Sequence, residues 1–344
     1  MYKISLEKLP VLLAAIAKEG KLYVPARKGS TTDFALWSAE TDVDIEKHLT
    51  ARSAKDLFFP QVENLYSFKT EGKKISIEEI MPTDEMTIAF GVRACDIRSF
   101  EILDMVFLKD PVDPYYKKRR ENTVLIGLGC AAPEETCFCG TFGIDAAAPA
   151  GDVTTYAADG FLYWEPRTDK GSALTETVKA LFETADDLAP VEAQRNRTRD
   201  VLKKLPLGSF RIAPKITESE LKTFDSDVWN KLYQGCLACC TCTFVCPTCH
   251  CYDIRDFVPG ETRTDRYRCW DSCMNRDFTK MAAENPRKTQ KERFRQRFMH
   301  KLVYFPENND GVYSCVGCGR CLAKCPVCNN IVKVAKALEA SEDV

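Results

Sequence analysis

The first 210 residues alternate between helix-like and strand-like patterns of apolar side chains. Residues 5–19 repeat apolar positions with the period of an amphipathic helix, and Gly20 ends that pattern. A short strand is expected directly afterwards, at 21–25, and mixed loop and strand at 57–68. None of these segments carries a recognisable catalytic or ligand pattern.

Two short apolar runs of β-prone residues predict buried strands at 86–92 and 124–128. A helix from about Ile97 to Phe107 is expected between them. Because parallel strands need a crossover connection, the order strand, helix, strand predicts a βαβ unit. We therefore expect an α/β domain with a partly parallel sheet over about residues 1–210.

The pattern after this unit predicts a hairpin, three helices and a linker. In chain order these are the hairpin 154–164 around Asp159-Gly160, helices 172–184 (N-cap Ser172) and 190–204, a linker at 205–216 and a helix at 216–232.

Composition adds little that is unusual. The chain has 344 residues, 45% hydrophobic and 28% charged, which is enough for two or three ordinary globular domains. Its net charge of −2 gives no reason to expect nucleic acid or a membrane surface as a partner. The first residues lack the pattern of a signal peptide, and no apolar run is long enough to predict a membrane span.

Cysteine is the residue type that changes this picture. There are 18 cysteines, and all but four lie between Cys236 and Cys328. Within that stretch the string C-x2-C-x2-C-x3-C-P occurs twice, starting at Cys236 and at Cys315. This spacing is the ligand pattern of proteins that hold two [4Fe–4S] clusters. Thiolate ligands fit a reducing compartment, so a cytoplasmic protein of anaerobic metabolism is expected.

The fourth cysteine of each motif, just before proline, is expected to serve the cluster of the other motif. The ligands therefore form two crossed sets. The first set is Cys236, Cys239, Cys242 and Cys325, and the second is Cys315, Cys318, Cys321 and Cys246. The competing hypothesis is a pair of zinc sites. Zinc usually takes two pairs of ligands, however, and does not call for a third cysteine at this spacing.

The four remaining cysteines follow the two predicted parallel strands, at the sheet edge where open sheets place ligands. We therefore expect them to converge and predict a third [4Fe–4S] cluster. A zinc site or simple packing would also be compatible with them, since free cysteine often behaves as a small buried hydrophobe. These four, the N-terminal set, are Cys95, Cys130, Cys137 and Cys139.

A long insert, residues 247–314, separates the two motifs. Its helical runs at 278–284 and 291–302 predict an all-helical, dicluster ferredoxin-like domain over about 216–344. The basic residues of the insert, like those of 113–120, indicate either a docking surface for an acidic partner or a solvated face. The leftover cysteines bind a further metal or pack beside the first cluster. They are Cys240, Cys249, Cys251, Cys269, Cys273 and Cys328.

Three stretches of the chain together resemble one family. They are Phe90-Gly-Val-Arg-Ala-Cys95-Asp-Ile, then Gly129-Cys130 with Cys137-Phe-Cys139-Gly, then Cys246-Pro-Thr-Cys-His-Cys251-Tyr-Asp with Cys269-Trp-Asp-Ser-Cys273. The family comprises the β subunit of cytosolic sulfhydrogenases, the A subunit of anaerobic sulfite reductase and related dicluster subunits. The resemblance covers about residues 85–340. Cys240-Thr241 departs from it, because glycine is more usual at the first position.

The resemblance implies a non-catalytic relay subunit and strengthens the prediction of a cluster at the N-terminal set. Electrons would pass between a flavin- and NAD(P)-binding partner and a catalytic subunit of an oxidoreductase complex. The alternative is a reductase subunit with its own cluster-based active site for sulfite or a disulfide. A zinc-stabilised interaction module is a third hypothesis. The chain shows no nucleotide-binding fingerprint, and its three histidines offer little for acid–base catalysis, so no catalytic residue is predicted.

Overall fold

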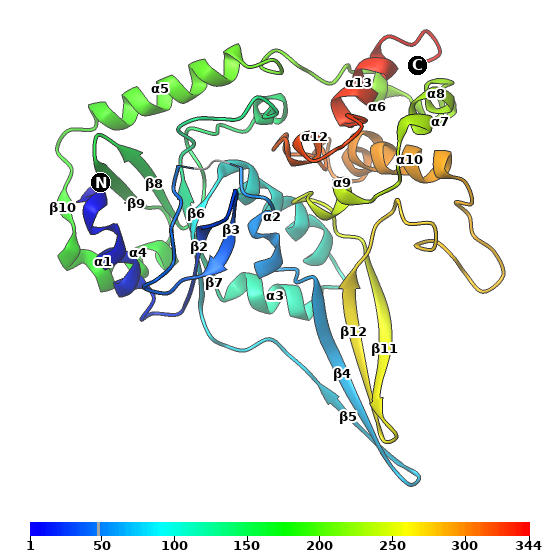
Figure 1. The fold of residues 1–344 in the computed structure, drawn as a ribbon, viewed down its shortest axis with the longest axis horizontal. Helices are drawn as coiled ribbons and strands as arrows, with labels where there is room; N and C mark the ends of the chain where they lie inside the picture. The colour runs from blue at the N-terminus through cyan, green and yellow to red at the C-terminus, as the bar shows by residue number, and fades with distance from the viewer. Residues whose placement is uncertain (47–48) are drawn as a thin grey trace.

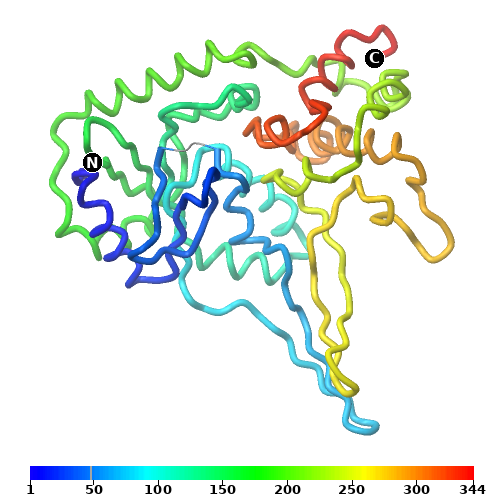
Figure 2. The backbone as a smooth tube through the Cα atoms, viewed as in Figure 1, coloured from blue at the N-terminus to red at the C-terminus, as the bar shows by residue number. Residues whose placement is uncertain are grey.

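The computed structural model describes residues 1–46 and 49–344. A large sheet with its helices occupies one side of the molecule, and a group of short helices near the C-terminus occupies the other (Figure 1). A narrow arm of strands projects away from both (Figure 2).

The large sheet has eight strands in the order β10-β1-β9-β8-β7-β6-β2-β3. Strands β2, β6, β7 and β8 run parallel to one another, and the other neighbours are antiparallel. The prediction of an α/β fold with a partly parallel sheet is therefore confirmed. The strands are β1 (Tyr2–Ser5), β2 (Lys21–Lys28), β3 (Thr31–Leu36), β6 (Thr87–Val92), β7 (Thr123–Leu128), β8 (Val153–Ala158), β9 (Phe161–Pro166) and β10 (Glu183–Thr184).

Helices cover both faces of this sheet because alternate side chains of a strand point to opposite faces. Ile88 and Ile126 pack against α1 and α4 on one face. Ala89 and Leu125 pack against α2 and α3 on the other. The helices of this part are α1 (Leu9–Ile16), α2 (Ala94–Phe107), α3 (Pro114–Glu121), α4 (Asp169–Val178) and α5 (Ala189–Lys204).

Most of the predicted elements appear where the pattern placed them, including the hairpin β8–β9 and the helix α5. The predicted N-cap Ser172 is wrong. Helix α4 begins three residues earlier, and the side chain of Thr168 caps it by accepting a hydrogen bond from Gly171 N. The basic run 113–120 is helix α3, and its Tyr115 and Tyr116 are buried.

The projecting arm is an antiparallel sheet in the order β11-β12-β4-β5. Two of its strands, β11 (Tyr252–Gly260) and β12 (Arg263–Trp270), belong to the insert between the cysteine motifs. The expectation of an all-helical 216–344 is therefore wrong. β12 pairs with β4 (Val62–Glu71), which in turn pairs with β5 (Lys74–Glu79). A local pattern cannot reveal a pairing between segments about 200 residues apart.

A buried ion cluster holds the base of the arm. Arg268 of β12 pairs with Glu63 of β4 and with Asp113, which caps α3. Its guanidinium also lies 5.1 Å from the ring centre of Phe59 and 5.2 Å from that of Tyr252. These contacts attach the insert to the α/β part of the chain.

The C-terminal helices are short and pack around Trp229, Phe294 and Val334. The predicted helix 216–232 is broken at Ser219, whose backbone is extended, and again at Ser226. Residues 278–284 form a short turn, a bend and irregular backbone instead of the predicted helix. The helices are α6 (Lys215–Glu218), α7 (Glu220–Asp225), α8 (Val228–Leu232), α9 (Thr241–Phe244), α10 (Gln290–Met299) with a π-helical turn at His300–Tyr304, α11 (Phe305–Asn308), α12 (Arg320–Ala323) and α13 (Ile331–Glu339). Across residues 1–46 and 49–344, no helix has the length and apolar character needed to cross a membrane.

Candidate iron–sulfur centres

The two cysteine motifs form two loops with the same backbone conformation. The first loop has positive φ at Ala238 (52°) and Cys240 (61°), and the second at the equivalent Gly317 (59°) and Gly319 (80°). A four-residue helix follows each pair, α9 in the first loop and α12 in the second. The sequence repeat is therefore also a structural repeat.

The fourth cysteine of each loop lies beside the first three of the other loop. Cys246, from the first loop, lines one small cavity together with Cys315, Cys318 and Cys321. Cys325, from the second loop, is close enough to Cys236 to raise the pKa of that thiol, after the larger effect of burial. Cys236 and Cys239 likewise add to the effect of burial and raise the pKa of the Cys242 thiol. The structure thus brings together the members of both crossed sets.

Buried cations surround these cysteines. Arg297 and Lys301 line the cavity of the second set, and Arg297 Nε is buried with no hydrogen-bond partner among the described residues. An unpaired buried N–H is costly unless an acceptor completes it, and a cluster sulfide is such an acceptor. Lys301 Nζ donates to Thr248 Oγ1 at 2.9 Å and to Ser314 O at 2.7 Å. Two positive charges at this place suit an anionic cluster.

The spacing of the cysteines also distinguishes a cluster from a single ion. Zinc requires its ligands within about 2.3 Å of one point, whereas a cubane spreads four thiolates over separate corners. Within the described ranges, no three His, Cys, Asp or Glu side chains are grouped closely enough for one metal ion. The repeated cysteine spacing and the unpaired Arg297 Nε fit a cluster better than zinc.

The four cysteines of the N-terminal set gather at the carboxyl ends of β6 and β7. Cys95 lies in the first turn of α2, and Cys130 follows β7. Both pack with Cys139 in one small apolar group. Burial, with a smaller contribution from the adjacent Cys130, raises the pKa of Cys137 and of Cys139 to about 12. The thiols are therefore neutral without a metal, and metal binding would release protons.

The N-terminal set lies directly against the second loop. Phe138 N donates to Gly317 O at 2.9 Å, and Cys137 Sγ is 3.9 Å from Cys318 O. A β-carbon at Gly317 would lie only 2.4 Å from Phe138 O, and one at Gly319 only 2.5 Å from Thr136 O. Glycine is therefore required at both positions for two reasons: the backbone has positive φ there, and segment 136–139 leaves no room for a β-carbon.

Arg320 joins the N-terminal set to the second set. Its guanidinium forms a bidentate pair with Asp96, at 2.6 and 2.8 Å, and donates to Thr50 O at 2.9 Å. Only 1% of either charged side chain is exposed. Burial raises the pKa of Cys95 and Cys318, and Arg320 opposes that shift at both thiols. One cation therefore acts on two predicted cluster sites.

Sequence reasoning missed these buried cations. The excess of Lys and Arg in the insert indicated a basic surface, but Arg268, Arg293, Arg297 and Lys301 are buried. Lys55 lies far from the cysteine motifs in the sequence, and no sequence pattern marked it as a buried cation. Its Nζ donates to Cys246 O at 3.1 Å and to Cys249 O at 2.9 Å, and lies 3.7 Å from the ring centre of Trp270.

The leftover cysteines divide into separate groups. A hydrogen bond from Cys273 lowers the pKa of Cys251 to about 7, although burial of this thiol acts in the opposite direction. Cys249 lies close to Cys273 and belongs to the same group. Cys269 is in β12, opposite Asp253 of β11. Burial lowers the pKa of the neighbouring His250 to about 4, so this imidazole is neutral.

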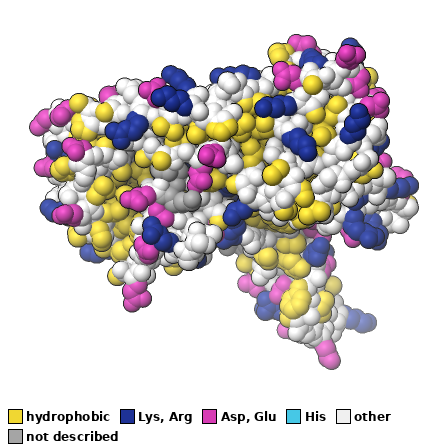
Figure 3. Space-filling view, turned by 45° about the horizontal axis from the view of Figure 1, so that its top comes forward, with side chains coloured by type: hydrophobic (Ala, Val, Ile, Leu, Met, Phe, Trp, Pro, Cys, Tyr) yellow, Lys and Arg dark blue, Asp and Glu magenta, His cyan; other side chains and the backbone are white. Residues whose placement is uncertain are grey.

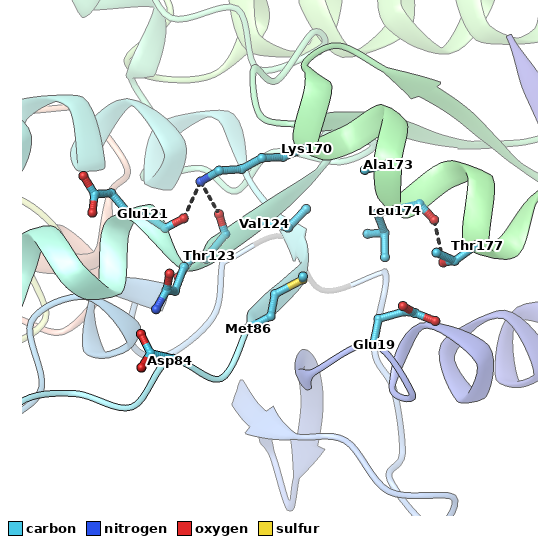
Figure 4. A pocket seen from close by; sticks show the side chains of 11 residues that line it. Glu19, Asp84, Met86, Glu121, Thr123, Val124, Lys170, Ala173, Leu174 and Thr177 are labelled. Atoms are coloured by element: carbon cyan, nitrogen blue, oxygen red, sulfur yellow. Dashed lines mark hydrogen bonds between the residues drawn. The ribbon is translucent and has the colours of Figure 1, made fainter.

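A pocket of about 340 Å3 lies at the opposite end of the parallel strands (Figure 4). Glu19, Asp84 and Glu121 line it together with apolar side chains, and Lys170 reaches across to Glu121 O at 2.6 Å. The described residues that line it include no cysteine.

Residues 235–329 match the family of the 4Fe–4S dicluster domain. Together with the paired loops, this match defines the class: an iron–sulfur protein with two [4Fe–4S] clusters in its C-terminal part. The chain is also 31% identical over 336 residues to the sulfhydrogenase 2 subunit beta of Pyrococcus furiosus, with 96% of each chain covered. It therefore belongs to the family of sulfhydrogenase β subunits, and the resemblance carried by its cysteine stretches is confirmed. It is an iron–sulfur electron-transfer subunit.

Proposed function

We propose that this chain relays single electrons within a cytoplasmic oxidoreductase complex, between a flavin- and NAD(P)-binding subunit and a catalytic subunit. The observation that carries the proposal is the contact between the cysteine sets. The N-terminal set lies against the second loop, and the fourth cysteine of each loop lies with the other loop. Such an arrangement supports a continuous path through the chain.

The proposed ligands are the two crossed sets and, for a third cluster, the N-terminal set. Each [4Fe–4S] cluster, when bound, accepts and donates one electron at a potential set by hydrogen bonds, charge and burial. The protein supplies those three controls. Arg297, Lys301 and Arg320 place positive charge beside the thiolates, and the second loop is buried, with Val316 only 1% exposed.

The experiment compares two cysteines three residues apart. The complex is isolated without oxygen through a tag on this chain, carrying either Cys325→Ser or Cys328→Ser. Cys325→Ser should remove the electron-paramagnetic-resonance signal of the first set and abolish electron transfer from NAD(P)H to the catalytic subunit. Reduction of a viologen dye by the flavin subunit alone should persist. Cys328→Ser, which removes an exposed thiol outside the sets, should leave the electron-paramagnetic-resonance signal of the first set unchanged.

Two results would contradict the proposal in different places. Loss of only the second set's signal in Cys325→Ser would refute the crossed assignment. Full electron transfer from NAD(P)H in a complex whose first-set signal is gone would refute the relay itself.

A further inference from the structure

The two equivalent loops differ sharply in how they are covered. Val316, in the second loop, is 1% exposed, whereas its equivalent Leu237 in the first loop is 64% exposed. Cys318 is buried and its equivalent Cys239 is exposed. Since the two backbones match, this difference comes from what lies on top of each loop.

The cover on the second loop comes from two segments that carry proposed ligands of the third cluster. Helix α2, which holds Cys95, packs on Val316 and Cys318 through Ile102. Residues 136–139, which hold Cys137 and Cys139, lie on Gly317 and Gly319. Within this chain, the outer face of a cluster loop is therefore the place where the next redox centre is attached.

The equivalent face of the first loop has no such cover in the described part of the chain. Leu237 lies between two cysteines of the first set, Phe244 follows the third, and Val327 and Cys328 follow Cys325. Phe244 and Val327 are 39% and 37% exposed. We name Leu237, Cys239, Phe244, Val327 and Cys328 the first-loop face. Figure 3 shows that hydrophobic side chains reach the surface on both parts of the molecule. A group of exposed apolar side chains such as the first-loop face marks a protein interface.

We propose that the first-loop face docks another subunit of the same complex, one that holds its own redox centre close to its surface. This inference rests on the proposed relay function and adds the place of electron exchange. The second loop supports this occupant, because the two segments that carry the N-terminal set, α2 and 136–139, lie on its matching face. The partner's contact differs in one respect. Ala238 and Cys240 carry β-carbons where the second loop has Gly317 and Gly319, so the partner packs on side chains instead of on the bare backbone.

The test measures the accessibility of Cys328 in the native complex, without any substitution. The tagged complex and the chain produced alone, both loaded with clusters, are treated with N-ethylmaleimide without oxygen, and labelling of Cys328 is followed by mass spectrometry. In a stable complex the free chain is rare, so the labelling rate should fall at least about tenfold relative to the isolated chain.

A pair of matched variants tests whether apolar contact at the first-loop face stabilises binding of the partner subunit. Leu237→Glu places a charge on the first-loop face, and Ile75→Glu does so on the arm at a similar exposure of 69%. Leu237→Glu should weaken retention of the partner roughly tenfold or more, with the iron content unchanged. Ile75→Glu should retain it.

Labelling of Cys328 at the isolated-chain rate while the partner subunits are bound would overturn the docking proposal and leave the relay standing. Failure of any subunit to co-purify with the tagged native chain would instead refute the proposed function, and the docking proposal with it.

Discussion

Replacing Arg320 tests the junction between the N-terminal set and the second set. Arg320→Gln removes a guanidinium that is 1% exposed and leaves the carboxylate of Asp96, equally buried, without its bidentate partner. Breaking a buried ion pair from one side costs about 3–5 kcal/mol of unfolding free energy, because an uncompensated charge remains inside the protein. The chain offers a control in a second bidentate Arg–Asp pair. Arg266 pairs with Asp256 at 2.8 and 2.9 Å, but both side chains are more than 40% exposed.

Arg266→Gln should cost less than about 1 kcal/mol, since solvent screens an exposed pair. The double variant Asp96→Asn/Arg320→Gln removes both charges, so its loss should be smaller than the sum of the single losses by about 2–3 kcal/mol. The assay is urea unfolding of the cluster-loaded protein without oxygen. An Arg320→Gln variant that is no less stable than Arg266→Gln would refute the reasoning.

The same variants should also change the reduction potentials of the proposed clusters on either side of Arg320. Removing a positive charge near Cys95 and Cys318 disfavours the added electron, so Arg320→Gln should lower the reduction potentials of both adjacent clusters. Asp96→Asn should raise them, and the double variant should return them toward the native values. A potentiometric titration followed by electron paramagnetic resonance measures these shifts. Unchanged potentials in Arg320→Gln would contradict the placement of this cation between two clusters.

Two further substitutions follow from the structure. Gly317→Ala should destabilise the protein by at least about 2 kcal/mol, because its β-carbon would lie 2.4 Å from Phe138 O at positive φ. Gly140→Ala has open space and should stay within about 0.5 kcal/mol of the native protein in urea unfolding; equal losses would contradict the packing argument. Burial lowers the pKa of His300 to about 3 and that of His250 to about 4. Between these values and about 6.5 the unfolded chain binds more protons, so stability should fall with decreasing pH by about 1.4 kcal/mol per unit for each histidine. His300→Phe should lose its share of this slope, and an unchanged slope would refute the assignment.

The parts of this protein that sequence predicts are those that local chemistry determines. The apolar runs at β6 and β7 required buried strands, and the cysteine spacing required paired loops. The prediction that the N-terminal cysteines converge needed only the rule that parallel strands end at one edge. The structure brings Cys95, Cys130, Cys137 and Cys139 together there.

The features that sequence did not predict depend on distant pairings. The arm joins β4 to β12, and neither strand is buried on both faces, so no local pattern distinguished the insert from helix. Sequence reasoning assigned the cations of the insert, Arg297 and Lys301 among them, to the surface and gave Lys55 no role. A buried cation is recognisable only from the thiols and carbonyls around it. The glycines Gly317 and Gly319 admit segment 136–139, and the motif spacing alone does not reveal that approach.

We propose three clusters in this chain, with the third at the N-terminal set. The most direct measurement is iron, acid-labile sulfide and zinc per chain, on protein prepared without oxygen. We expect about twelve iron atoms and no stoichiometric zinc per chain, and about eight iron atoms in a Cys137→Ser/Cys139→Ser variant. About eight iron atoms in the native protein would contradict the proposal of three clusters. The N-terminal set would then serve packing alone or, with one zinc per chain, form a structural site.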